Sequence, residues 1–169
     1  TLGGDIKKKL KAISKAGFHS IELFDTDLDR FEGNSKELNN LIKDFGLNLA
    51  SYFPLRNFEG MPEEKKESVF NEAKYYLDTA KELESEMVMI CSNTNQESLA
   101  NEKKITSDLN ELAEIAKTFE IKLAYEALAW GTHVNGYRHA MRLIHDADHE
   151  NLGIALDAFH ILSKQDDIN

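Results

Sequence analysis

Apolar runs and amphipathic stretches alternate along the whole chain. Short continuous apolar runs bounded by turn residues are typical of buried strands, and they predict strands over residues 18–24, 47–53, 87–91, 121–125 and 152–156. Between these runs apolar residues recur every three or four positions, as on one face of a helix, which predicts helices over residues 5–16, 35–45, 62–83, 104–119 and 136–147. Pro54 directly follows the second run and is expected to end that strand, because proline donates no backbone hydrogen bond.

This order of elements predicts an α/β fold. Strands that alternate with helices pair in parallel, and the helices cover the sheet. The strands are continuous apolar runs rather than alternating ones, which is expected where both faces of a sheet are buried. No low-complexity linker or shift in composition interrupts the pattern, so residues 1–169 are predicted to form a single domain.

Polar residues follow every predicted strand. Arg56 and Glu59 come after the second strand, Ser92 and Asn93 after the third, and Glu126 ends the fourth. Asp157 and His160 follow the fifth strand, while Glu22 lies within the first and Asp25 just after it. The carboxyl ends of the strands of a (β/α)8 barrel converge on one active site, whereas an open doubly wound sheet collects ligands only at its switch point. The pattern therefore favours a barrel, and no glycine-rich phosphate motif follows any of the strands.

Glu126 and Asp157 are the strongest candidates for a metal or acid–base site. Each is a carboxylate at the end of an apolar run, where an ionised group is costly unless it is paired or bound to a metal. The alternative for Glu126 is a structural ion pair near the rim. His160 follows Asp157 by three residues, and it is either a partner in the same chemistry or an ordinary buried histidine.

Arg56, Glu22 and Ser92 each have two interpretations. The planar guanidinium of Arg56 suits a substrate carboxylate, but a surface ion pair explains it equally well. Glu22 interrupts an apolar run, so it either points into the barrel or pairs with a neighbour. Ser92 and the following Asn93 either donate hydrogen bonds to a ligand or stabilise a turn.

Composition excludes several classes of function. The 169 residues include one cysteine, Cys91, which rules out an intramolecular disulfide and a cysteine-rich zinc site. Neither a signal peptide nor an apolar run of about 20 residues is visible, so we expect a cytoplasmic protein. The formal charge of −10 argues against nucleic acid and against an anionic membrane surface. A small anionic substrate would need a local cation to offset this charge.

Several segments together resemble one enzyme family. They are Gly17–Phe24, Pro54–Gly60, Cys91–Asn93, Tyr125–Gly131 and Leu156–His160, in this order. The set resembles the bacterial 3-dehydroshikimate dehydratases of the sugar phosphate isomerase/epimerase superfamily, whose wider fold is the xylose isomerase-like TIM barrel. The resemblance covers almost the whole chain. It implies loss of water from 3-dehydroshikimate to give protocatechuate in quinate and shikimate catabolism.

The resemblance also implies roles for single residues. Glu126 and Asp157 would be the first two of four ligands to a divalent cation, with Mg²⁺ or Mn²⁺ preferred by oxygen-rich ligands and Co²⁺ as an alternative. Arg56 would face the substrate carboxylate. His160 would lie beside the metal as the catalytic proton-transfer residue, without assignment as acid or base. Glu59, Glu22 and Ser92 would line the substrate pocket.

The length of the chain departs from that family. A complete barrel has about 250 residues, so we expect a partial barrel of about five βα units, truncated at both ends, in which the first and the last two strands are missing. Such a chain is expected to show little dehydratase activity by itself and to self-associate through open sheet edges. Two alternatives remain, a metal-dependent sugar or sugar-phosphate isomerase/epimerase and a non-catalytic fragment that self-associates.

Overall fold

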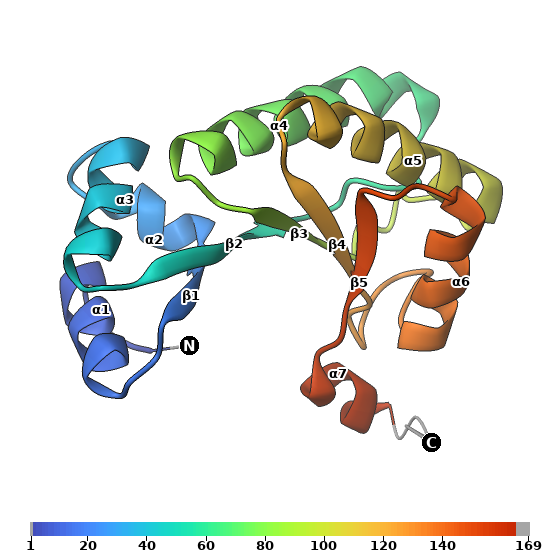
Figure 1. Cartoon of the computed structure of the whole chain (residues 1–169). Coiled ribbons are helices and arrows are strands. Elements are labelled where there is room, and N and C mark those ends of the chain that lie inside the picture. Colours follow the sequence, from blue (N-terminus) through green and yellow to red (C-terminus); the bar gives the residue numbers. More distant parts are fainter. Residues whose placement is uncertain (1, 165–169) are drawn as a thin grey trace.

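The fold is a parallel α/β sheet bent into an arch (Figure 1). The computed structural model describes residues 2–164. Five strands pair in parallel in the order of the sequence; they are β1 (Ser20–Phe24), β2 (Asn48–Leu55), β3 (Met87–Cys91), β4 (Lys122–Glu126) and β5 (Leu152–Ala155). This arrangement confirms the predicted α/β fold, and its curvature is that of part of a barrel wall. The single-domain boundary at residues 1–169 stays a prediction.

Five long helices cover the outer side of the arch (Figure 1). They are α1 (Ile6–Lys15), α3 (Ser35–Asp44), α4 (Glu63–Glu82), α5 (Glu102–Thr118) and α6 (Tyr137–Ala147). Their positions confirm the helical periodicity of the sequence to within a few residues at each end. Asp5 caps α1, and Asn34 forms a reciprocal capping box with Glu37 at the start of α3, so local side chains define where these helices begin.

Two short helices, α2 (Asp25–Asp29) and α7 (Ala158–Ser163), were not predicted. Each is one to two turns long, which is too short for a helical period to be recognised in the sequence. The helix α2 directly follows β1, and α7 begins after the two residues that follow β5, so these helices turn the chain away from the carboxyl ends of the two strands. The side chain of Asp157 accepts a hydrogen bond from the backbone N–H of Phe159 and thereby caps α7.

The prediction that Pro54 ends the second strand was wrong. The strand β2 continues to Leu55, and the Phe53–Pro54 peptide bond is cis. The pairing of β2 with β3 is irregular at this point, with Tyr52 opposite Val88 and Leu55 opposite Ile90. Because the ladder is interrupted between Tyr52 and Leu55, the proline does not need to supply a hydrogen bond there.

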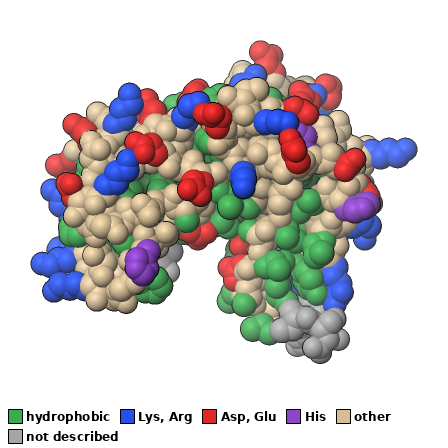
Figure 2. All heavy atoms as spheres, in the orientation of Figure 1, with side chains coloured by type: hydrophobic (Ala, Val, Ile, Leu, Met, Phe, Trp, Pro, Cys, Tyr) green, Lys and Arg blue, Asp and Glu red, His purple; other side chains and the backbone are tan. Residues whose placement is uncertain are grey.

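The core lies between the sheet and the outer helices. Fully buried leucines such as Leu77 of α4 and Leu109 of α5 belong to one core cluster with Val88 and Ile90 of β3. The inner side of the sheet is open instead, and Figure 2 shows the hollow beneath the arch. A cavity of about 580 Å³ there is lined by residues that include Glu22, Met89, Glu126 and Asp157. Within residues 2–164, no helix has the length and apolarity that crossing a membrane requires.

Candidate active site

Glu126 is held at the carboxyl end of β4, opposite Cys91 of β3. Its residue surface is only 4% exposed, and its Oε2 accepts a hydrogen bond from the Cys91 thiol at 3.4 Å. Burial raises the pKa of the Glu126 carboxyl above its ordinary value. A thiol is a weak donor, so this contact offsets little of the cost of burying a carboxylate. The ionised form of Glu126 therefore requires a further positive partner.

Asp157 and His160 lie on the first turn of α7, directly after β5. His160 is buried, and its Nε2 is 3.9 Å from Oδ2 of Asp157. The other ring nitrogen, Nδ1, accepts a hydrogen bond from the backbone N–H of Ala129 at 3.3 Å. With Nδ1 engaged in this way, Nε2 is the ring nitrogen that faces Asp157.

The structure brings Glu126, Asp157 and His160 together. Their nearest donor atoms all lie within 4.8 Å of one another, close enough to coordinate one cation. Two carboxylates form a donor set that suits divalent cations such as Mn²⁺, Mg²⁺, Co²⁺ or Zn²⁺, and the imidazole lies beside them. Within residues 2–164 the buried Glu126 carboxylate forms no ion pair with Lys or Arg, so a bound cation would supply a positive partner. The two carboxylates that the sequence singled out therefore fit a divalent metal ion, with His160 beside them.

A pocket of about 950 Å³ opens beside this cluster and holds Arg56 in the same lining as Glu126, Asp157 and His160. Its size is within the range of small-molecule sites. The Nη1 of Arg56 donates a hydrogen bond to Oδ2 of Asp25 at 2.6 Å. Arg56 thus forms an ion pair and lines the pocket at the same time, so the two interpretations of this residue are compatible.

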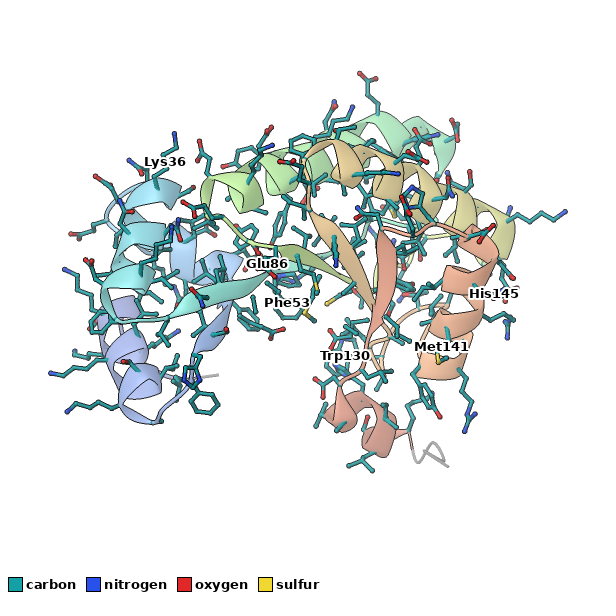
Figure 3. All side chains as sticks on the ribbon, in the orientation of Figure 1. Lys36, Phe53, Glu86, Trp130, Met141 and His145 are labelled. Atoms are coloured by element: carbon teal, nitrogen blue, oxygen red, sulfur yellow. The ribbon has the colours of Figure 1, made fainter. Side chains whose placement is uncertain are left out.

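Aromatic side chains form much of the pocket wall. Phe24 and Phe53 meet edge to face with ring centroids 4.8 Å apart. Trp130 packs at 4.8 Å against the ring of His160 and at 6.4 Å against Phe159. Figure 3 labels Phe53 and Trp130, and both lie beneath the arch. Flat side chains on two walls suit a ring-shaped ligand.

Glu22 and Ser92 also line this pocket. Glu22 points to the inner side of the sheet, where its Oε1 accepts a hydrogen bond from the Ser51 hydroxyl at 3.1 Å. The Oγ of Ser92 accepts the backbone N–H of Leu128 at 2.9 Å, so Ser92 stabilises the loop after β4. Contact of either residue with a substrate stays a prediction.

Glu59 does not lie where a pocket residue is expected. It is 1% exposed, and among the described residues it is absent from the lining of both cavities beneath the arch. Its Oε1 accepts hydrogen bonds from the Asn93 backbone N–H and from the Tyr125 hydroxyl, both at 2.7 Å. Burial raises the pKa of Glu59 to about 7 in spite of these two donors. The side chain lies behind the pocket and not in it.

The loop that carries Trp130 is closely packed at Gly131. A Cβ atom at this position would lie 2.1 Å from the carbonyl oxygen of Val134 and 2.6 Å from Oγ of Ser92. Thr132 continues the contact, because its backbone N–H donates to the carbonyl oxygen of Asn93 at 2.8 Å. Only glycine leaves room for this approach, which fixes the loop against the end of β3.

Sequence reasoning assigned no role to two residues of this site. Asp25, the partner of Arg56, directly follows the first apolar run, so its position at a strand end was a usable signal. Tyr125, the partner of Glu59, lies inside an apolar run, and nothing in the sequence distinguishes it from a core tyrosine.

Comparisons with known proteins agree with this architecture. Residues 10–169 match the family model described as xylose isomerase-like TIM barrel. A 3-dehydroshikimate dehydratase of Pseudomonas putida is 36% identical over 167 residues, which are 99% of this chain and 26% of that protein. A solved structure described as a xylose isomerase-like TIM barrel/4-hydroxyphenylpyruvate dioxygenase fusion protein superposes with a TM-score of 0.96 at 36% identity, covering 98% of this chain and 27% of the other.

A more distant likeness concerns the fold alone. The crystal structure of IOLI protein with a bound zinc atom has a TM-score of 0.83 at 21% identity, covering 98% of this chain and 62% of that one. This chain spans only about a quarter of the length of the Pseudomonas putida dehydratase and of the fusion protein. The match to the family model nevertheless extends over most of the chain, in agreement with the curved parallel sheet. The chain belongs to the xylose isomerase-like TIM barrel family.

Proposed function

We propose that this site serves the metal-dependent dehydration of 3-dehydroshikimate to protocatechuate. The observation that carries the proposal is the convergence of Glu126, Asp157 and His160 within 4.8 Å, in one pocket with Arg56. A cation and a guanidinium in one pocket match a substrate that carries both a ketone and a carboxylate. The likeness to the Pseudomonas putida dehydratase supports this choice of substrate.

Arg56 would bind the carboxylate of the substrate. Its ion pair with Asp25 uses Nη1, so further N–H groups of the guanidinium remain for a ligand. Because Asp25 fixes the orientation of the side chain, Arg56 is positioned before the ligand arrives. The aromatic pairs Phe24–Phe53 and Trp130–Phe159 would enclose the ring and exclude water from it.

Glu126 and Asp157 would hold the metal ion, with His160 beside them. When bound, a divalent cation supplies Lewis-acid stabilisation of the negative charge that develops on the carbonyl oxygen as an adjacent proton is removed. We propose Mg²⁺ or Mn²⁺, because carboxylate oxygens predominate in the donor set, with Co²⁺ as an alternative. The zinc atom belongs to the IOLI structure, and it makes zinc a necessary comparison in any metal titration.

His160 would hold its ring proton at Nε2, facing the pocket. The Nδ1 atom accepts the Ala129 amide, which orients the ring and directs Nε2 toward Asp157 and the pocket. Histidine is the side chain most often used for proton transfer in catalysis, so a ring N–H at this position is suited to assist the elimination of water. One ring proton and a hydroxide leave as water, and a second ring proton moves to the carbonyl oxygen, which yields the aromatic diphenol.

The test begins with binding. We expect the chain to bind Mn²⁺, measured by electron paramagnetic resonance, and the metal-loaded chain to bind protocatechuate, measured by calorimetry. Arg56→Ala is expected to weaken binding of protocatechuate at least about tenfold, because a charge-assisted contact to the carboxylate is lost. Arg142→Ala is the matched control, because Arg142 is an exposed arginine paired with Glu102 on the outer surface. Equal binding by both variants would contradict the role of Arg56.

Turnover separates the proposal from its alternatives. Protocatechuate formed from 3-dehydroshikimate is followed by its ultraviolet absorbance, and sugar or sugar-phosphate interconversion is measured in parallel. Turnover of sugars without dehydration would favour an isomerase or epimerase. Dimerisation that is unchanged by EDTA in sedimentation, without binding of metal or ligand, would favour a non-catalytic self-associating fragment. Rapid dehydration by the chain alone would overturn the expectation that it is inactive by itself.

The location of this protein in the cytoplasm stays a prediction.

A further inference from the structure

Glu59 is a buried carboxyl group that the proposed reaction does not use. It lies in the loop between β2 and α4, and it contacts the ends of two other strands. Its Oε1 accepts hydrogen bonds from the backbone N–H of Asn93, after β3, and from the hydroxyl of Tyr125, on β4. Its backbone carbonyl accepts a third hydrogen bond, from Nδ2 of Asn93 at 2.7 Å. One residue thus joins three segments that are far apart in the sequence.

The burial of this carboxyl is costly and calls for an explanation. The second oxygen, Oε2, is buried without a hydrogen-bond partner among the described residues. An apolar side chain of similar size would avoid that cost, but it would leave the Tyr125 hydroxyl and the Asn93 amide without their acceptor. The function of Glu59 therefore lies in what these two donors hold in place.

Both partners of Glu59 are adjacent to site residues. Tyr125 directly precedes Glu126, and successive side chains of a strand point to opposite faces, so a fixed Tyr125 fixes the direction of Glu126. Asn93 directly follows Ser92, whose backbone N–H donates to the carbonyl oxygen of Glu126 at 2.8 Å. The end of β4 is thus held from the Tyr125 side and from the Ser92 side.

The loop that contains Glu59 has a second anchor of its own. The backbone N–H of Gly60 donates to Oδ2 of the buried Asp108 at 2.9 Å, and Asp108 is paired with Lys104 on the same helix, α5. The carbonyl oxygen of Gly60 accepts the backbone N–H of Leu99 at 2.8 Å. Glu59 therefore extends from a loop that is itself fixed. A residue can position its partners only if its own backbone is held in place.

We propose that Glu59 is a positioning residue that holds the ends of β3 and β4 together and so aims Glu126 at the metal ion. The inference rests on the proposed function for the role of the metal, but the link between Glu59 and the strand ends does not depend on it. Groups that orient a metal ligand contribute to metal affinity without touching the metal.

Three variants and one control test the inference. Glu59→Leu removes the acceptor at similar volume, Glu59→Gln retains an oxygen acceptor for both donors, and Tyr125→Phe removes one hydroxyl only. Glu97→Leu is the control, because Glu97 is an exposed glutamate on the neighbouring loop. Two quantities are measured for each variant, the affinity for Mn²⁺ and the amide hydrogen exchange of Ser92, Asn93 and Leu128 in metal-free chain.

Glu59→Leu is expected to weaken Mn²⁺ binding about tenfold or more, in the range found for groups that support metal ligands. It should also speed amide exchange at Ser92, Asn93 and Leu128 by about tenfold, with no comparable change in the helices. Glu59→Gln is expected to restore both quantities to within about threefold of the original chain, and Tyr125→Phe should lie between the two. Glu97→Leu should leave both unchanged.

Each outcome decides the inference. Unchanged exchange at the three amides in Glu59→Leu, or the same change in Glu97→Leu, would overturn it. Unchanged Mn²⁺ affinity in a Glu59→Leu chain that binds the metal would do the same. If the original chain binds no Mn²⁺, the metal part of the proposed function fails, while the exchange data still decide whether Glu59 holds the strand ends. If Glu59→Leu does not fold, Tyr125→Phe and Glu59→Gln supply the same comparison.

Discussion

The two carboxylates of the candidate metal site are held in different ways. Glu126 lies on the β3–β4 side, where its strand is paired on both edges and the Glu59 network supports its end. Asp157 lies on the β5–α7 side, where its side chain is exposed and caps the short helix α7. Its neighbours Leu156, Phe159 and Leu162 are exposed as well, with 59%, 63% and 62% of their surface accessible.

This difference indicates how the site responds to change. Glu126 is placed by tertiary structure, because residues from three separate segments determine where the end of β4 lies. Asp157 is placed by local structure, because its side chain accepts the backbone N–H of Phe159 and its carbonyl oxygen accepts that of Ile161, two and four positions away. Damage to the core should therefore displace Glu126, whereas damage to α7 should displace Asp157 and His160 and leave Glu126 in place.

The largest expected effect compares one leucine on each side. Leu123→Ala, on β4, removes a side chain that is 2% exposed and should lower the free energy of unfolding by about 2–5 kcal/mol. Leu162→Ala, on α7, should change it by less than about 0.5 kcal/mol. Urea unfolding followed by circular dichroism measures both. Similar losses for the two variants would mean that α7 is as tightly packed as β4.

The pH dependence of stability tests the Glu59 side of the comparison. The pKa of Glu59 is raised from the ordinary 4.5 to about 7 by burial. Between these values the folded chain binds more protons at Glu59 than the unfolded chain does, so a rise in pH removes stability. Relative to Glu59→Gln, the original chain should lose about 1–3 kcal/mol of unfolding free energy from pH 4.5 to 7, with little further change above pH 8. A constant difference between the two chains across this range would contradict the raised pKa.

Metal affinity sharpens the comparison at the site itself. Glu126→Gln and Asp157→Asn should each weaken Mn²⁺ binding about 10- to 100-fold, because an amide oxygen replaces a carboxylate (about 1.4–2.8 kcal/mol). Asparagine still caps a helix, so Asp157→Asn should leave the free energy of unfolding within about 0.5 kcal/mol. Calorimetric titration with Mn²⁺, Mg²⁺ and Zn²⁺ gives the affinities. Full affinity in Asp157→Asn would remove Asp157 from the metal site.

The smallest expected effect concerns the cap of α7. Asp157→Ala removes the hydrogen bond to the Phe159 amide and should cost about 0.5–1 kcal/mol, confined to that helix. Trp130 is the single tryptophan of the chain and packs against His160 and Phe159, so its fluorescence reports on α7. We expect the emission of Trp130 to change while the far-ultraviolet circular dichroism stays the same. A loss of overall stability would show that α7 supports more of the fold than its exposure indicates.

The sequence predicted the strands of the sheet better than the segments that follow the strands. Apolar runs such as Met87–Cys91 indicate strands that are buried on both faces of the sheet, and each run can be recognised from its own residues alone. The path of β2 through Pro54 depends on an irregular pairing with β3, which is a property of two segments and is not visible in either one. The helices α2 and α7 are too short to carry a period.

The part of the candidate site that lies at the strand ends was predictable, because the carboxyl ends of parallel strands converge. The position of Glu126 at the end of an apolar run and the three-residue spacing of Asp157 and His160 were sufficient signals for the cluster. The placement of Glu59 was not predictable, because the conformation of its loop depends on Asn93 and Tyr125. The pairing of Arg56 with Asp25 was left open for the same reason, since a contact across 31 residues has no local signature.

Gly131 has a consequence for how this pocket can diversify. Any side chain at this position collides with the Val134 carbonyl and the Ser92 hydroxyl, so the backbone path of the loop tolerates no exchange there. The adjacent Trp130 is mostly exposed and meets no such limit. Selection for a new ligand, in nature or in the laboratory, would therefore act through the identity of residue 130 on a loop of constant shape. A library randomised at position 130 should yield many folded members, whereas one randomised at position 131 should return glycine.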